Sequence, residues 1–416
     1  MAINIHAPSR RELLLASGAL FAWAGMPKLA RAEGRDPRLL VIVLRGALDG
    51  LATAAPVGDP DWIRLRGDKA LKLEGPTPAL PLDGFFALNP AMPNLHRLYR
   101  AGQATIVHAA ATPYRERSHF DGQDVLESGL TQPGVADTGW LNRALAALAP
   151  ESEVLAHSRA AFAVGPVTPL IVRGPAPILP WTPPRLPPAT DDTVMRLLDL
   201  YRHTDLALAR VLEERMGLAA IVRAGDMDTG QAKANPGGGV AQVRSYFAES
   251  AGAAAKFLAQ PDGPRIGALA FDGWDTHADE GEVSGRLANL LGALDGAIAA
   301  VETQMGGAWR ETVVALVTEF GRTARINGTQ GTDHGTATVA LLAGGALKGG
   351  RVIADWPGVA EAKLYENRDL MATTDLRAVM KGLLRDHVRV RDDALATSVF
   401  PDSAGVKPMT GLVVSA

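Results

Sequence analysis

LLVIVLRGALDG, at residues 39–50, is the first strongly patterned stretch of this 416-residue chain. Its six leading apolar residues end at Arg45, and a continuous apolar run of this length is typical of a strand buried in a parallel sheet. The alternation of such runs with amphipathic helical segments predicts an α/β fold, with a mostly parallel central sheet and helices on both faces. The expected strands are 39–44, 104–108, 266–271, 312–318 and 338–342, and the expected helices are about 192–217, 239–259, 283–304 and 374–387.

The first 32 residues have the features of an export signal. Paired arginines at 10–11 precede an apolar run of about 14 residues, 13–26, which is shorter than a membrane-spanning helix. A basic residue and an A-x-A cleavage site at 30–32 follow. This order predicts a twin-arginine signal peptide over 1–32, with the Tat translocase as a partner during export and a periplasmic or secreted mature protein. The alternative is a chance arginine pair on an amphipathic helix.

Residues 38–416 are expected to form a single domain, because no internal repeat or low-complexity tract marks off a second module. The stretch 165–188 contains nine prolines, so it is predicted to be a surface excursion rather than a regular helix or central strand. No segment after residue 32 has the pattern of a transmembrane helix, and the mature protein is therefore expected to contain no integral membrane segment.

Composition excludes several function classes. Lys and Arg number 42 against 45 Asp and Glu, and the resulting net charge of −3 excludes a basic nucleic-acid binder. The chain has no cysteine, which excludes a disulfide framework, a thiolate zinc site and a cysteine nucleophile. Any metal ion must therefore be held by histidines and carboxylates.

Acidic residues and histidines follow the expected strands, at the edge where parallel sheets bind ligands. Asp275 and His277 are two residues apart, so at an extended strand end their side chains point to the same side. Carboxylates brought close together repel one another unless a cation lies among them, and the clustering therefore predicts a metal site. The predicted ligands are Asp49, Asp275, His277, Glu319, Asp333 and His334.

These residues also have structural explanations. Asp49 precedes a glycine, which is typical of a turn, and Glu319 fits the first turn of a helix. Asp275 with His277 is also consistent with a capped turn. The pair at 333–334 has glycines on both sides, which let the backbone approach a bound ion closely.

Cationic and further polar residues lie beside the same clusters. Arg45, Arg117 and Arg322 are predicted to bind an anionic ester through bidentate hydrogen bonds, with ion pairs inside the domain as the alternative. His119 and Asp121 are additional candidates for the site.

Five motifs and the N-terminal signal resemble, in the same order, the exported family of unknown function called DUF1501. The motifs are LLVIVLRGALDG (39–50), RSHFDGQDVLESG (117–129), FDGWDTH (271–277), TEFGR (318–322) and GTDHG (331–335). The resemblance covers about residues 38–416. It implies the alkaline phosphatase superfamily, with the sulfatases and cofactor-independent phosphoglycerate mutases, and hence an alkaline-phosphatase-like sheet with metal at its strand carboxyl ends.

The resemblance also implies roles for individual residues. Asp49 matches the superfamily's acidic metal ligand after the first strand, and Asp275 and His277 loosely match its Asp and His pair for one metal. Glu319 stands where those enzymes have an aspartate, but the ligand histidine that should follow is Phe320. The GTDHG loop is similar to the later histidine-bearing loop.

The superfamily also uses a hydroxyl or modified cysteine nucleophile. Thr112 and Ser118 lie in the matching region, and Ser118 precedes an expected helix whose N-terminal dipole would favour a bound phosphate. The spacing does not decide between them. The absence of cysteine argues against a formylglycine sulfatase.

These features together predict an exported metal-dependent hydrolase that acts on a small anionic phosphate or sulfate ester. One or two divalent ions are expected; mixed nitrogen and oxygen ligands favour zinc, with manganese, iron, calcium or magnesium as alternatives. The rival class is a non-catalytic periplasmic binding or assembly protein that keeps the fold and a structural metal. A lyase or transferase using the same site is a third alternative.

Overall fold

The structure, a computed structural model, describes residues 35–134, 136–150, 152, 154, 160–165, 168–181, 210 and 240–414. Its contacts divide the chain into two units, of which the second is Asp36–Ala416. The predicted signal peptide at 1–32 lies outside the described residues, as does the expected helix at 192–217 apart from residue 210.

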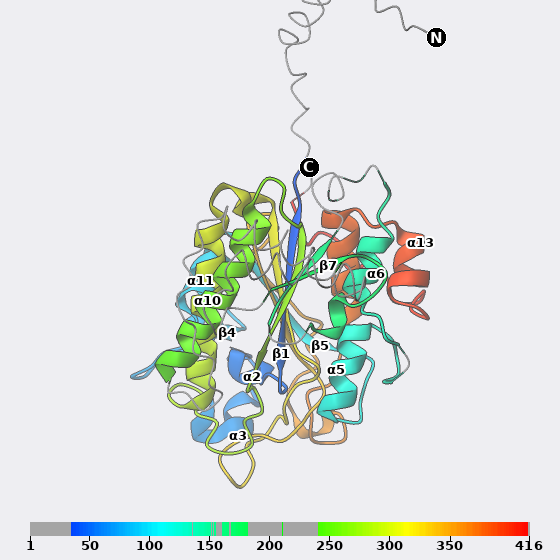
Figure 1. Ribbon diagram of the computed structural model, residues 1–416. Helices are drawn as coiled ribbons and strands as arrows, with labels where there is room; N and C mark the ends of the chain where they lie inside the picture. The colour runs from blue at the N-terminus through cyan, green and yellow to red at the C-terminus, as the bar shows by residue number, and fades with distance from the viewer. Residues whose placement is uncertain are drawn as a thin grey trace, which may run out of the picture. The chain divides into compact units, whose positions relative to one another are not determined.

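A nine-stranded sheet forms the centre of the second unit (Figure 1). Strand β1 pairs in parallel with β8 and β9, whereas β10 is antiparallel to β9 and β5. The prediction of a mostly parallel sheet is confirmed. β10 runs the other way because residues 318–337, which join it to β9, contain no crossover helix. The strand order is β11-β5-β10-β9-β1-β8-β6-β7, with β12 paired to β5.

The five expected strands all occur in this sheet. They are β1 (Arg38–Arg45), β5 (Ala104–Ala111), β8 (Ile266–Asp272), β9 (Thr312–Val317) and β10 (Thr338–Ala343). The other members are β6 (Ala161–Val164), β7 (Ile178–Trp181), β11 (Arg351–Ile353) and β12 (Thr374–Asp375). β7 lies within the proline-rich stretch at 165–188 and is an edge strand of the sheet. Proline has no backbone N–H to donate, and an edge strand tolerates it because one of its sides has no neighbouring strand to pair with.

Helices cover both faces of the sheet. Because successive side chains of a strand point to opposite faces, alternate residues of β1 pack into two separate cores. Leu40 and Ile42 pack toward α4 (Pro93–Arg100), α10 (Val240–Ala259) and α11 (Arg286–Met305). Val41 and Val43 pack on the side of α5 (His119–Ser128), α6 (Trp140–Ala146) and α12 (Leu376–Leu383). Figure 1 shows α10 and α11 on one side of β1 and α5 and α6 on the other. Three of the four expected helices thus correspond to α10, α11 and α12.

Shorter elements complete the described chain. A second sheet has the order β2-β4-β3. It consists of β2 (Ala54–Ala55), β3 (Leu80–Pro81) and β4 (Ala87–Leu88), next to the helices α2 (Gly50–Thr53) and α3 (Trp62–Arg66), and α13 (Asp392–Ala394) lies near the C-terminus. None of the helices in the described ranges combines the length and the hydropathy that a membrane crossing requires.

Candidate metal centre

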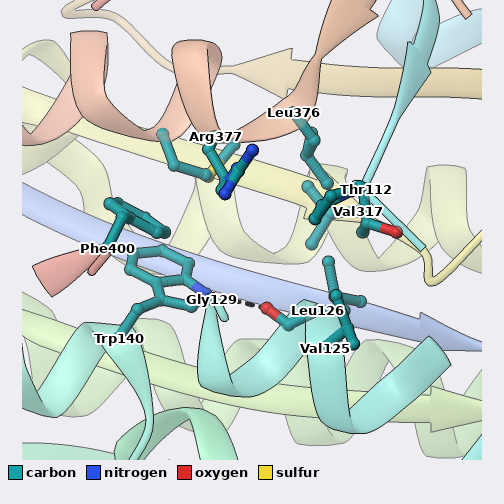
Figure 2. Close-up of a pocket in the computed structure, with 11 residues that line it drawn as sticks. Thr112, Val125, Leu126, Gly129, Trp140, Val317, Leu376, Arg377 and Phe400 are labelled. Atoms are coloured by element: carbon teal, nitrogen blue, oxygen red, sulfur yellow. Dashed lines mark hydrogen bonds between the residues drawn. The ribbon is translucent and has the colours of Figure 1, made fainter. Parts of the chain in front are cut away.

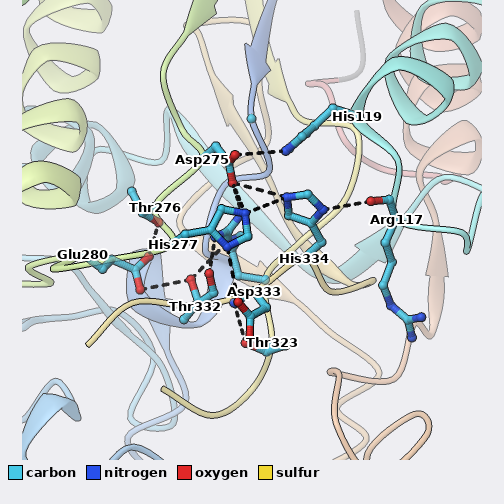
Figure 3. Close-up of polar contacts among 12 residues, drawn as sticks. Arg117, His119, Asp275, Thr276, His277, Glu280, Thr323, Thr332, Asp333 and His334 are labelled. Carbon is cyan, nitrogen blue, oxygen red and sulfur yellow. Dashed lines mark hydrogen bonds and ion pairs between the residues drawn. The ribbon is translucent and has the colours of Figure 1, made fainter. Parts of the chain in front are cut away.

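Three connecting segments meet at one edge of the sheet, where β5 and β8 end and β10 begins. Asp275 and His277 follow β8, His334 precedes β10, and His119 is the first residue of α5, which follows β5. Ligand atoms of His119, Asp275 and His334 all lie within 4.8 Å of one another. Figure 3 shows the side chains converging, with His277 beside them. These four residues are called the histidine group below.

The Asp275 carboxylate is the centre of the histidine group. Its Oδ1 lies 3.0 Å from Nε2 of His277 and 3.4 Å from Nε2 of His334. Its Oδ2 lies 3.5 Å from Nε2 of His119. The Nε2 atoms of His277 and His334 are 3.0 Å apart. Three imidazoles therefore present the same ring nitrogen to one carboxylate.

The opposite nitrogen of each ring faces a protein oxygen. Nδ1 of His119 is 2.8 Å from Glu319 Oε1, and Nδ1 of His334 is 2.9 Å from the carbonyl oxygen of Arg117. Nδ1 of His277 is 3.3 Å from Asp333 Oδ1. A neutral imidazole that donates its Nδ1–H in this way keeps the Nε2 lone pair, which is how metal-binding histidines are held in proteins.

The spacing of these donors is close to that of zinc ligands. Zinc–nitrogen bonds of about 2.0–2.1 Å place two ligands of one tetrahedral ion about 3.3 Å apart, and the separations given above lie between 3.0 and 3.5 Å. The mutually close set consists of His119, Asp275 and His334, and His277 adjoins it through Asp275 and His334. Within the described chain, Nε2 of His119 is buried and has no hydrogen-bond partner. Buried polar atoms are normally paired, and Asp275 Oδ2 lies opposite this nitrogen at 3.5 Å, so a cation bound by both atoms fits the arrangement.

Glu319 fixes His119 from a fully buried position at the end of β9. Its Oε1 also accepts hydrogen bonds from the backbone N–H of Gly46 at 2.9 Å and from Gln123 at 3.2 Å. Its Oε2 accepts one from Thr318 at 2.9 Å. Burial alone would raise the pKa of Glu319, but the bond from His119 and these other donors lower it. The carboxylate is therefore ionised and saturated by the protein.

The same contacts shift the pKa values of the neighbouring groups. The hydrogen bond to Glu319 raises the pKa of His119, whereas burial and the nearby His119 lower the pKa of His334. Burial opposes ionisation of Asp275, but the hydrogen bond and charge of Arg322 outweigh it and lower the pKa of that carboxyl group. Asp275 is therefore available as an anionic ligand at neutral pH.

Glycines let the backbone segments around the group approach one another. A Cβ on Gly331 would lie 2.4 Å from the carbonyl carbon of His277, and one on Gly122 would lie 2.9 Å from the ring of Phe320. Both distances are shorter than real Cβ contacts, so a side chain at either position would push the loop or α5 away. Phe320 in turn stacks on His119, with ring centroids 5.0 Å apart.

Asp49, a predicted ligand, lies outside the histidine group. Its carboxylate accepts two hydrogen bonds from Arg66, at 2.8 and 3.2 Å, and caps α2 by accepting from the N–H of Ala52 at 3.0 Å. Both charged side chains are buried. The turn explanation of Asp49 is therefore consistent with its contacts, and Arg66 supplies the neutralising cation.

Asp333, a predicted ligand, and Asp121, an additional candidate, contact other protein side chains. Asp333 holds the Nδ1 edge of His277 and accepts from Asn327 at 3.1 Å. Asp121 accepts from the hydroxyl of Tyr114 at 3.3 Å.

All three predicted anion-binding arginines form ion pairs inside the protein. Arg45 pairs with Glu127 at 2.6 Å, and Arg117 pairs with Asp369 at 2.8 Å. Arg322 is buried and its Nη1 lies 2.5 Å from Asp275 Oδ1. The ion-pair alternative thus describes the contacts of all three.

The two predicted nucleophiles occupy different surroundings. Ser118 precedes His119 directly, and its side chain makes no capping hydrogen bond to α5. Thr112 is buried and donates to the carbonyl oxygen of Glu319 at 3.3 Å. It also lines a small apolar cavity with Trp140 and Phe400 (Figure 2).

Several residues that support the site were not predicted from the sequence. Gln123 lies four residues after His119 on α5, so the two side chains are neighbours on the helix, and both contact Glu319. This spacing is the signal in the sequence that could have indicated Gln123. Glu280 is buried and accepts from Thr276 at 2.8 Å and Thr332 at 3.2 Å, and burial raises its pKa to about 8. No motif marked it, because its partners come from separate loops.

No protein with a curated description is similar enough to this chain to count as a relative. Among solved structures, the chain is similar to the C-terminal periplasmic domain of EcEptC from Escherichia coli in complex with Zn, with 11% identity, a TM-score of 0.33, and coverage of 75% of this chain and 74% of that one. The PsFucS1 sulfatase from Pseudoalteromonas sp. is similar with 12% identity and a TM-score of 0.32, over 84% of this chain and 68% of that one. The phosphonate monoester hydrolase of Agrobacterium radiobacter is similar with 13% identity and a TM-score of 0.31, over 76% of this chain and 70% of that one. The sequence pattern of one family matches residues 36–397. The chain belongs to this family, which is described as protein of unknown function (DUF1501).

Proposed function

We propose that the histidine group binds one divalent metal ion and that the protein is a metal-dependent hydrolase of phosphate or sulfate esters. The observation that carries the metal site is the common orientation of three imidazoles. Each has Nδ1 at a protein oxygen and Nε2 within 3.5 Å of Asp275. Arg322 pairs with Asp275, but the imidazole nitrogens have no such partner: Nε2 lone pairs that face one another repel, and a bound cation removes that repulsion.

Zinc fits this donor set best. Three imidazole nitrogens and one carboxylate are typical zinc ligands, and manganese or iron would accept the same set. Calcium and magnesium prefer oxygen ligands, so a site with three nitrogens disfavours them.

One ion is favoured over two. Three further carboxylates were predicted as ligands. Asp49 and Glu319 are saturated by protein donors, and Asp333 contacts Asn327 and Nδ1 of His277. Arg66 already supplies a positive charge at Asp49. A second cation would have to displace those contacts, at the expense of a buried ion pair.

The hydrolase proposal also draws on the motif order and on Ser118. A bound divalent ion supplies Lewis-acid polarisation of an ester oxygen and lowers the pKa of a coordinated hydroxyl or water. Ser118 is the better candidate nucleophile, since it adjoins His119 and its hydroxyl is not engaged in capping α5. Arg322 holds Asp275 in its ionised form.

A non-catalytic binding or assembly protein is the second candidate function. The observation that favours it is the pairing of Arg45, Arg117 and Arg322 with acidic partners, because an anionic substrate then has to compete for these cations. In that case the histidine group would hold a structural metal. Under either function, we propose export through the Tat translocase and a periplasmic or secreted location.

Elemental mass spectrometry of the purified mature protein tests the metal site. The wild-type chain is compared with His334→Ala and with His96→Ala, a matched control whose half-buried ring lies 2.8 Å from the carbonyl oxygen of Pro81. We expect one zinc per chain in the wild type and the control, and none in His334→Ala. The zinc-loaded proteins are then assayed with 4-nitrophenyl phosphate, bis(4-nitrophenyl) phosphate and 4-nitrophenyl sulfate.

Hydrolysis that His334→Ala and Ser118→Ala abolish would support the hydrolase. Stoichiometric metal without hydrolysis of any ester would favour the binding protein. A wild-type chain that holds no metal and takes up none from added zinc, manganese or iron would contradict both.

A further inference from the structure

Arg117 contacts the histidine group through its main chain rather than its charge. Its carbonyl oxygen lies 2.9 Å from Nδ1 of His334 (Figure 3). Its φ is +60°, in the left-handed region that residues with a side chain rarely adopt. An extended or right-handed conformation would turn the peptide group and move this carbonyl away from His334. The orientation of the oxygen therefore depends on whatever stabilises the unusual backbone.

The Arg117 side chain provides that stabilisation. Its Nε donates to Asp369 Oδ2 at 2.8 Å, and its Nη2 donates to Glu366 Oε2 at 2.5 Å. The guanidinium also lies 5.8 Å from the ring centroid of Tyr365. Asp369 is fully buried, so this bond is sheltered from solvent and is stronger than the exposed one to Glu366.

The anchor is itself fixed to the site's loops. Asp369 forms a β-bridge with Thr323, and the N–H of Ala324 donates to the carbonyl of Arg368 at 3.0 Å. Thr323 in turn follows Arg322, whose guanidinium holds Asp275. The segment 365–369 is thus connected to both the Asp275 and the His334 sides of the histidine group.

We propose that Arg117 is a positioning residue for the metal, and that Asp369 holds it in place. The ion pair keeps Arg117 in its left-handed conformation, and its carbonyl then accepts the Nδ1–H of His334. This fixes the His334 tautomer with Nε2 directed at the metal position. The inference rests on the proposed metal site and reassigns Arg117, which the sequence suggested as a substrate clamp.

Zinc affinity of the full mature chain, measured by competition with a chromophoric chelator, tests the inference. The variants are Asp369→Asn, Arg117→Ala and Arg117→Gly, with Arg97→Ala as the control. Arg97 is also ion-paired, to Glu302, but on an exposed surface. Loss of an outer partner of a metal-binding histidine typically weakens binding about 10–100-fold. We expect this loss in Asp369→Asn and Arg117→Ala, and wild-type affinity in Arg97→Ala.

Arg117→Gly separates positioning from general destabilisation. Glycine adopts a φ of +60° without strain, so the carbonyl can remain in place without the side chain. We expect its zinc affinity to lie clearly above that of Arg117→Ala, and the ligand-field spectrum of its cobalt-loaded form to match the wild type. A merely structural role of Arg117 predicts instead that Arg117→Ala and Arg117→Gly change the free energy of unfolding while the folded proteins keep wild-type zinc affinity.

The outcomes distinguish this inference from the proposed function. If Asp369→Asn and Arg117→Ala bound zinc with the same affinity as the wild type, the positioning role alone would be overturned. The same conclusion would follow if the zinc affinity of Arg117→Gly were no higher than that of Arg117→Ala. A wild-type chain without zinc affinity would overturn the metal site and this inference with it.

Discussion

Two neighbouring polar regions near one edge of the sheet satisfy their charges in opposite ways. In the Asp49 region, comprising Asp49, Arg66 and His108, every strong donor or acceptor has a protein partner. In the histidine group, the Nε2 atoms face one another and Asp275, and that of His119 is buried without a hydrogen bond. Arg66 pairs with both oxygens of Asp49, whereas Arg322 pairs with Oδ1 of Asp275 and leaves three imidazole Nε2 atoms facing that carboxylate. This difference is why we propose a metal site in the histidine group and none at Asp49.

Removing a ligand of the histidine group should have the largest effect. We expect His119→Ala to lower zinc affinity by more than the ~100-fold that loss of an outer partner causes, since it deletes a direct ligand. Isothermal titration calorimetry with zinc checks this, with His96→Ala as the control. Equal affinities in the two variants would assign the metal to other residues.

Removing the charge of Asp49 should instead affect stability. Asp49→Asn keeps a side-chain oxygen for the α2 cap but leaves the buried Arg66 without its anion, and we expect unfolding to become easier by about 3–5 kcal/mol. Urea denaturation measures this, and zinc stoichiometry should stay at one per folded chain. Asp61→Asn, which breaks the exposed pair with Arg64, is the control and should cost about 0–1 kcal/mol. Loss of zinc in folded Asp49→Asn would move Asp49 into the metal site.

Acidification should destabilise the Asp49 region through His108. This ring is buried; it donates to the carbonyl of Ala54 at 2.8 Å and accepts from the N–H of Ala109 at 2.8 Å, so both nitrogens are satisfied only in the neutral form. Burial lowers its pKa from 6.5 to about 4.

The unfolded chain therefore binds the extra proton first, and stability falls as pH decreases from 6.5 toward 4, by about 3 kcal/mol in total. Denaturant titrations of the metal-free protein across this range, compared with His108→Gln, isolate the contribution. Parallel curves for the two proteins would show that His108 is not its source.

The smallest expected effect is at Glu319, whose Oε1 lies 2.8 Å from Nδ1 of His119. Glu319→Gln retains the shape of the side chain but loses the charge that orients and polarises His119, and we expect about 10–100-fold weaker zinc binding. Glu302→Gln, an exposed glutamate paired with Arg97, is the matched control. Unchanged affinity in Glu319→Gln would show that the ring is positioned by packing against Phe320 instead.

Much of the fold could be predicted from the sequence, because buried strands and amphipathic helices leave local patterns. The run at 39–44 forms β1 inside the sheet, and the expected helix at 283–304 packs its leucines into the core on one face. The direction of β10 has no such local signature, since it depends on which neighbours the strand pairs with.

The candidate site could be predicted only in part. Asp275, His277 and His334 stand in short glycine-rich motifs, and the structure brings them together. Asp49 looked equivalent, but its partner Arg66 lies 17 residues away on another helix and no pattern links them. His119 was only an additional candidate, because its importance comes from Glu319, 200 residues further along the chain.

X-ray absorption at the zinc edge of the purified, zinc-loaded protein tests the central claim most directly. We expect a single ion with three imidazole nitrogens and one carboxylate oxygen at about 2.0–2.1 Å, and loss of one imidazole contribution in His277→Ala. A shell dominated by oxygen, or a second metal at about 3.5–4 Å, would contradict it by showing that Asp49 and Glu319 release their protein partners to bind metal.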